Sequence, residues 1–194
     1  MKRTIFLLVS LMLAFSQLQA QVHHQKNVVK DAKGHTYVIV PGSQVLKYPD
    51  GSLKSFTPAK SMAVWNGRNK SYLASAGKAI TLYQDGTLKS FYPQNNVMVW
   101  DGAGKSYQAM AGQLIEFYPD GSVKTFTPMY QITVQTALGK EYEAMAGKQV
   151  QLYENGFVKS FYPVKKIKVK ARNKKYKVQP GRLIQFDSEG YFIH

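Results

Sequence analysis

The chain contains no cysteine among its 194 residues. This absence excludes disulfide cross-links, cysteine metal sites and thiol catalysis, and also the acylated cysteine that anchors a bacterial lipoprotein. Acidic residues are scarce, with 11 Asp and Glu against 26 Lys and Arg. Hydrophobic residues make up 44% of the sequence, which is enough for a packed core and argues against a disordered polycation.

Apolar runs are short, and the longest lies at the N-terminus. Lys2-Arg3 precedes an apolar stretch over 5–15, and Ala20 provides a small residue before a polar one. This pattern is typical of a secretory signal peptide, and the stretch is too short to cross a bilayer as a helix. We therefore predict a signal peptide over 1–20 and a flexible mature N-terminus over 21–27. An uncleaved anchor is the alternative.

The predicted export places the protein in the periplasm or outside the cell, without a lipid anchor and without a membrane-spanning segment after cleavage. The formal net charge is +15, and removal of residues 1–20, which hold two basic and no acidic side chains, leaves +13. Such a charge favours polyanionic partners. For an exported protein we expect acidic glycans or phosphorylated head groups before nucleic acid, which is not an expected partner in vivo.

One sequence unit occurs five times at a spacing of 35 residues, shortened by one residue in the last unit. Its valine marker falls at Val29, Val64, Val99, Val134 and Val169. Tyrosine, glycine, lysine, phenylalanine and proline positions recur in the same way. Such periodicity indicates a repeat fold. We predict a single β-repeat domain over 28–194, with units 28–58, 59–93, 94–128, 129–163 and 164–194.

Each unit has the pattern of four short strands, which we call A, B, C and D. In the third unit they are 97–100, 106–109, 114–117 and 123–126, and Pro119-Asp120-Gly121 supplies the hairpin turn between C and D. Alternation along C and D predicts a core face and an opposite, amphipathic face. The opposite face repeats tyrosine beside lysine: Tyr48, Tyr83, Tyr118 and Tyr153 with Lys54, Lys89, Lys124 and Lys159.

The fold class predicted from these units is all-β. Connections of two to five residues make sequential strands antiparallel neighbours, so each unit is expected to be a four-stranded meander. Five meanders form either a small propeller or an open, rolled or stacked repeat sheet. Propeller blades usually contain roughly 40–50 residues, which counts against closure. Strands of about five residues are also shorter than those of a membrane barrel.

The Tyr-x-Asp-Gly-x-hydrophobic-Lys hairpin, Tyr118 to Lys124 in the third unit, resembles the short hairpin units of bacterial MORN-like repeat proteins. The resemblance covers only strands C and D. MORN units are shorter and richer in glycine, and strands A and B have no counterpart in them. The resemblance implies a scaffold, often one for interactions, and assigns no active residue.

The densest positive charge lies in the fifth unit. Alternation places Lys166, Lys168 and Lys170 on one face of strand A, and Lys175 and Lys177 flank Tyr176 on strand B. A hairpin would join them into one basic face suited to a polyanion. The full candidate set is Lys166, Lys168, Lys170, Arg172, Lys174, Lys175 and Lys177. The alternative is a charged cap that prevents edge-to-edge association.

Two further surfaces are candidates. Trp65, Trp100, Tyr92 and Tyr162 occupy positions that accept polar residues in other units, so they are expected at the surface, where rings can stack on sugars or bases. The alternative is that the tryptophans pack against a neighbouring unit. The tyrosine–lysine positions could bind phosphates or carboxylates along a polymer, or the lysine stems could simply cover apolar surface.

Catalysis is not expected. Four acidic residues occupy the repeated turn, where they have a conformational role, and the sequence shows no nucleophile elbow, phosphate-binding loop or metal-ligand spacing. His23-His24 is expected to be part of a flexible terminus. We predict no enzyme activity, no cofactor and no metal site.

The resulting hypothesis is an exported, non-enzymatic binding protein that contacts an anionic polymer or glycan of the cell envelope or host. The alternatives are a lectin-like or protein-interaction scaffold that uses the tryptophans, with a possible protein partner, and a structural envelope component.

Overall fold

The computed structural model describes residues 27–193. Outside the described residues lie the predicted signal peptide over 1–20, the following residues 21–26, which include His23 and His24, and the last residue, His194. Every regular element in 27–193 is a β-strand. This part of the chain accordingly holds no helix that is long and apolar enough to cross a membrane.

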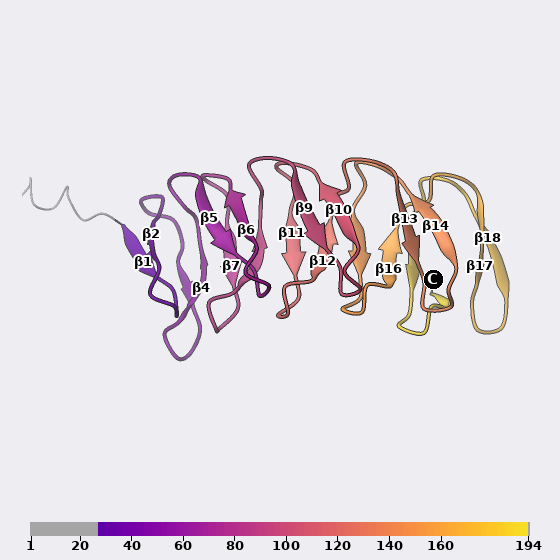
Figure 1. The fold of residues 1–194 in the computed structure, drawn as a ribbon, viewed down its shortest axis with the longest axis horizontal. Helices are drawn as coiled ribbons and strands as arrows, with labels where there is room; N and C mark the ends of the chain where they lie inside the picture. The colour runs from indigo at the N-terminus through magenta and orange to yellow at the C-terminus, as the bar shows by residue number, and fades with distance from the viewer. Residues whose placement is uncertain (1–26, 194) are drawn as a thin grey trace, which may run out of the picture.

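Ten strands, two from each unit, form one antiparallel sheet, which we call the main sheet. Its order is β20-β19-β16-β15-β12-β11-β8-β7-β4-β3, so the C and D strands of successive units follow one another along the molecule (Figure 1). The strands are β3 (Leu46–Lys47), β4 (Leu53–Phe56), β7 (Ile80–Leu82), β8 (Leu88–Phe91), β11 (Ile115–Phe117), β12 (Val123–Phe126), β15 (Val150–Leu152), β16 (Val158–Phe161), β19 (Ile184–Phe186) and β20 (Phe192–Ile193).

The A and B strands form five separate two-stranded hairpins, which we call the hairpin layer. Each pairs only within its own unit. Its buried side chains and those of the main sheet belong to one core cluster, so the hairpin layer covers one face of the main sheet. The strands are β1 (Val28–Lys30), β2 (Thr36–Val38), β5 (Met62–Trp65), β6 (Ser71–Ala74), β9 (Val97–Trp100), β10 (Ser106–Ala109), β13 (Ile132–Gln135), β14 (Glu141–Ala144), β17 (Ile167–Lys170) and β18 (Lys175–Val178).

The prediction of an all-β repeat is confirmed, and the main sheet is open rather than closed into a propeller. The expectation that sequential strands always pair is wrong for B and C, which lie in different layers. The reason lies in the loop between them. Gly77 adopts a left-handed φ of 68° and its N–H bonds to the carbonyl of Pro58 at the end of the preceding unit. This link carries the chain from one layer to the other, so no hairpin forms there.

The core lies between the two layers. Ile115 and Phe117 of β11 and Val123 of β12 are buried, as alternation predicts. Phe126 is also buried, although alternation from Val123 predicts the opposite face, because the pairing of β11 with β12 shifts register and leaves Lys124 as an extra residue. The hairpin layer contributes residues such as Val99 and Tyr107. Rings from neighbouring units stack in this core: Tyr72 contacts Phe91 of its own unit and Phe117 of the next, at centroid distances of 5.3 Å for both. The units therefore share one continuous core.

The turns also connect neighbouring units. The A–B turn of each of the first four units packs against the C–D turn of the following unit, and glycine makes this approach possible. A Cβ atom at Gly102 would lie 1.8 Å from the Glu154 carbonyl oxygen, and one at Gly67 would lie 2.3 Å from the Pro119 carbonyl oxygen. Only a residue without a side chain fits at these two positions.

Candidate functional site

The last hairpin of the hairpin layer presents a basic face. In β17 and β18, Lys168 lies opposite Lys177 and Lys170 opposite Lys175. All four side chains are exposed, while Ile167 and Val169 between them are buried. Opposed residues of an antiparallel pair have Cα atoms about 4.5–5.5 Å apart, so these like charges repel one another. We call these four lysines the basic face.

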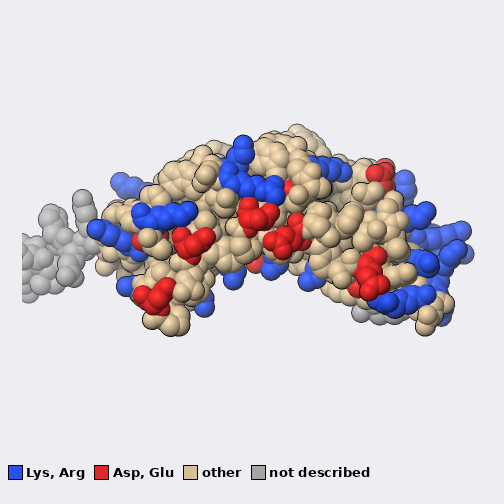
Figure 2. Space-filling model, turned by 60° about the horizontal axis from the view of Figure 1, so that its bottom comes forward, with Lys and Arg blue, Asp and Glu red and all other residues tan. Residues whose placement is uncertain are grey.

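None of the four lysines of the basic face forms an ion pair with any residue in 27–193. One of them, Lys170, places its Nζ 5.5 Å from the centroid of the Tyr191 ring. The blue side chains that gather at the end of the molecule opposite the N-terminus in Figure 2 belong to this unit. Of the five lysines predicted to form one basic face, the strand register sets Lys168, Lys170, Lys175 and Lys177 in opposed pairs, whereas Lys166 precedes β17 and has no partner in the register.

The other predicted members of the polyanion set have different surroundings. The Arg172 guanidinium lies 2.9 Å from a Glu189 oxygen and 3.4 Å from Asp187, so it holds the C–D turn of its own unit. The Lys174 Nζ lies 5.2 Å from the Tyr176 ring centroid. Lys166, which precedes β17, is exposed. We therefore place Arg172 outside the basic face.

Acidic residues border the basic face on one side. Glu141 and Glu143 of the neighbouring strand β14 point away from the core, and Glu143 pairs with Lys165 at 2.8 Å. The Tyr142 hydroxyl donates to the Lys168 carbonyl at 3.2 Å, which fixes β14 beside β17. A polyanion would therefore approach from the end of the molecule and not along the hairpin layer.

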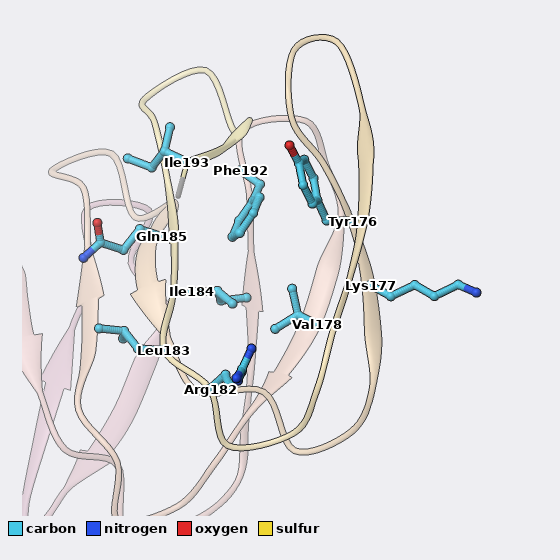
Figure 3. A pocket seen from close by; sticks show the side chains of 9 residues that line it. All are labelled: Tyr176, Lys177, Val178, Arg182, Leu183, Ile184, Gln185, Phe192 and Ile193. Atoms are coloured by element: carbon cyan, nitrogen blue, oxygen red, sulfur yellow. The ribbon is translucent and has the colours of Figure 1, made fainter.

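A cavity of about 510 Å³ opens beside the basic face, between the two layers. Val178, Ile184 and Phe192 line it, whereas the side chain of Lys177 projects away from it (Figure 3). Val178 and Lys177 are adjacent residues of β18, so period-two alternation turns one toward the cavity and the other away from it.

The tyrosine and lysine positions of the main sheet form a regular row on the face opposite the core. The four lysine Nζ atoms lie 5.5, 5.5, 5.9 and 5.8 Å from the ring centroids of Tyr48, Tyr83, Tyr118 and Tyr153, in chain order. Burial, helped by the nearby Glu116 carboxylate, raises the pKa of Tyr83 to about 12, so its hydroxyl remains a neutral hydrogen-bond donor at physiological pH. We call these residues the tyrosine–lysine row.

The predicted aromatic surface is divided in two. Trp65 stacks on His35 of the preceding unit at 5.5 Å, and Trp100 lies 5.1 Å from Lys70 Nζ, also of the preceding unit. Trp65 lies at the turn end of the β5–β6 hairpin, where it pairs with Ser71. Tyr92 lies near the opposite end of the same hairpin, because its carbonyl accepts a hydrogen bond from the N–H of Ser75. Tyr92 and Tyr162 instead lie beside Lys78 and Lys148, each at 5.8 Å. Trp65, Trp100, Tyr92 and Tyr162 therefore do not make one continuous surface.

The first three hairpins expose apolar side chains on their outer face. Val28 and Val38 of the first hairpin, Trp65 and Leu73 of the second and Met98 of the third are 38–48% exposed. This apolar strip was not identified from the sequence. Its signal was available, because each of these residues is adjacent along its strand to a residue that faces the core, so alternation turns it outward.

A second feature that sequence reasoning missed is a buried polar position in the A–B turn. Asp101 is 2% exposed; it accepts hydrogen bonds from the Tyr107 hydroxyl at 2.9 Å and from the backbone N–H groups of Ala103 and Lys105. Recurrence at Asp31, Asn66 and Thr136 at the same spacing could have revealed it. These residues order the turn, and residues 27–193 contain no cluster of three potential metal ligands.

Comparison with known proteins found no protein family, no curated protein and no solved structure that matches the chain. The resemblance of the C–D hairpins to MORN-like repeats therefore stays a prediction from the hairpin residues.

Proposed function

We propose that the protein is an exported binding protein without catalytic activity of its own, and that its basic face binds an anionic polymer of the cell envelope or host. The observation that carries this proposal is the register of β17 and β18, which sets Lys168 opposite Lys177 and Lys170 opposite Lys175 with no carboxylate partner in 27–193. Unpaired like charges side by side cost stability in the folded state. A bound polyanion would relieve that cost.

The test is retention of the purified protein on an immobilised polyanion, heparin, across a salt gradient. The variant changes Lys168, Lys170, Lys175 and Lys177 to Gln, and the matched control changes the exposed Lys60, Lys78, Lys140 and Lys148 to Gln. Both variants lose the same charge. The proposal requires that the first variant elutes at a clearly lower salt concentration than the wild type, and that the control elutes at a concentration closer to that of the wild type. The reason is that only lysines in contact with the polyanion release counterions on binding and so determine the salt concentration needed for elution. Equal shifts would mean that only net charge matters.

A second candidate is a protein-interaction scaffold, which the apolar strip favours. Contiguous exposed apolar area is unusual on a monomeric protein unless it contacts another surface. The candidate occupant is a second copy of this chain. Sedimentation of the wild type and of a variant with Trp65, Leu73 and Met98 changed to Ser tests it. Concentration-dependent association of the wild type, absent in the variant, would support this candidate; monomers in both would reject it.

A further inference from the structure

The face of the main sheet that points away from the core carries four tyrosines held in one orientation. Their hydroxyls each donate to a backbone carbonyl in strand C of the next unit: Tyr48 to Leu82 at 2.9 Å, Tyr83 to Phe117 at 2.8 Å, Tyr118 to Leu152 at 2.9 Å and Tyr153 to Phe186 at 2.7 Å.

This hydrogen bond defines how each ring lies. Each tyrosine follows strand C of its unit, and the carbonyl that accepts its hydrogen bond is in strand C of the next unit. In the sheet order, strand D of the tyrosine's own unit lies between these two C strands. Each ring therefore spans strand D on the outer face, and all four rings are only half-buried. Because both ends of the side chain are fixed, the rings are ordered before any ligand arrives, which reduces the entropy cost of binding.

The repeat distance of the rings follows from the sheet. Strands in a sheet are about 4.8 Å apart, and each unit adds two strands, so neighbouring rings are separated by about 9.6 Å. This distance is close to the length of one extended disaccharide in a β-linked polysaccharide. Three such steps separate Tyr48 from Tyr153. A polysaccharide chain running across the strands would place every second sugar over a ring.

Charge and polar groups repeat with the same period. Lys54, Lys89, Lys124 and Lys159 each accompany one ring. Thr81, Glu116 and Gln151 stand two residues before Tyr83, Tyr118 and Tyr153, on the same face of their C strands. Thr125 donates to the Glu116 carboxylate at 2.8 Å, so this acid is already partnered. The row thus offers one cation per disaccharide length. A nucleic acid strand carries its phosphates much closer together, about 3.4 Å apart along a duplex.

From these observations we propose that the tyrosine–lysine row is a platform for an extended β-linked polysaccharide with one acidic group per disaccharide. Alternate sugar rings stack on the tyrosines, and the carboxylate or sulfate of each repeat binds the adjacent lysine. The polar side chains of strand C lie on the same face as the rings, where sugar hydroxyls would contact them. This site is separate from the basic face, so either proposal can fail alone.

Calorimetric titration with hyaluronan oligosaccharides of two, four, six and eight sugars tests this site, because hyaluronan carries one carboxylate per disaccharide. Chitin oligosaccharides of the same lengths are the neutral comparison. We expect affinity to rise with each added hyaluronan disaccharide and to be weaker for the neutral chains. Affinity that does not depend on length, or is equal for both polymers, would overturn the proposal.

Variants assign the binding to the row. Tyr83→Ala with Tyr118→Ala should lower hyaluronan affinity at least about tenfold, since a single stacked ring typically contributes a factor of this size. Tyr83→Phe with Tyr118→Phe keeps both rings and should retain most of the affinity. Lys89→Gln with Lys124→Gln should remove the preference for hyaluronan over chitin, and this pair stays informative if the alanine variant does not fold.

The basic-face variant separates this proposal from the proposed function. It should bind hyaluronan oligosaccharides as the wild type does. If the basic-face variant loses hyaluronan binding and the folded ring variants keep it, the platform is rejected and the polysaccharide binds only at the fifth unit.

Discussion

The hydroxyl of Tyr118 donates a 2.9 Å hydrogen bond to the carbonyl of Leu152, 34 residues further along the chain. The same bond recurs between every pair of successive units from the first to the fifth. It belongs to no strand ladder, and it ties each unit to the next on the outer face of the main sheet. The tyrosine of the C–D hairpin is therefore an inter-unit connector as well as a surface ring.

This relationship predicts the effect of removing one hydroxyl. Tyr118→Phe keeps the ring and loses the bond, so the free energy of unfolding should fall by about 1 kcal/mol. Tyr130→Phe is the control, because Tyr130 is 59% exposed and donates no hydrogen bond within 27–193. Urea denaturation of both variants measures the difference. Equal stability of the two variants would show that water replaces the bond without cost.

The glycines in the A–B turns predict a larger effect. Gly102→Ala would place a methyl group 1.8 Å from the Glu154 carbonyl oxygen, so two turns from different units must separate. Overpacking of this kind costs about 1–3 kcal/mol, and here it should loosen the contact between the third and fourth units. Urea denaturation measures the loss, with Ser106→Ala on the exposed end of β10 as the control. A stable Gly102→Ala protein would mean that the turns shift freely.

Much of this architecture follows from sequence periodicity. The 35-residue spacing predicts the number of units and the strands, and alternation predicts the buried face of strand C and the buried first residue of strand D, because both are local properties that five copies repeat. The burial of Phe126 on strand D does not follow, since it depends on a register shift in the C–D hairpin. The separation of the A–B hairpins from the main sheet cannot be predicted from this periodicity. It depends on Gly77 reaching back to Pro58 of the preceding unit, and the short loop at 75–79 is equally compatible with a hairpin.

The candidate sites show the same division. The register that pairs Lys168 with Lys177 follows from a symmetrical hairpin around the turn and was predictable. Two other contacts could not be predicted: the ion pair of Arg172 with Glu189 and the stacking of Trp65 on His35. Both depend on how separate turns and hairpins meet in the folded protein. Contacts within one hairpin are local, whereas contacts between layers and units require the assembled repeat.

The turn aspartates predict a decline in stability at low pH. Burial acts to raise the pKa of Asp120, but hydrogen bonds from Ser122 and Arg68 outweigh it and hold that pKa below its ordinary value. Hydrogen bonds with Thr87 lower the pKa of Asp85 in the same way, again against the opposing effect of burial. A lowered folded-state pKa stabilises the protein above the unfolded-state value of about 3.9. This stabilisation is lost as the pH falls through the folded-state pKa.

Asp120→Asn tests this sign. At neutral pH the variant should unfold at lower urea concentration than the wild type, because it loses the 2.9 Å ion pair with Arg68. The difference should shrink as the pH falls below about 4 and vanish once Asp120 is protonated in the folded protein. A difference that stays constant from neutral to acidic pH would show that the ion pair and its linkage contribute nothing, and that the substitution acts only on the turn.

The basic face predicts opposite effects on stability and on binding. Lys168→Glu replaces a repelling pair with an attracting one opposite Lys177, and such cross-strand changes are worth about 0.2–1 kcal/mol. The melting temperature should therefore rise at low salt, with a smaller gain at high salt because screening weakens both interactions. Retention on heparin should fall in the same variant. Lys60→Glu, with no lysine in register, should show no comparable salt-dependent gain in stability. If Lys168→Glu instead lowers stability, the lysines contribute to the fold itself, and a cap against edge association becomes the better account of the fifth unit.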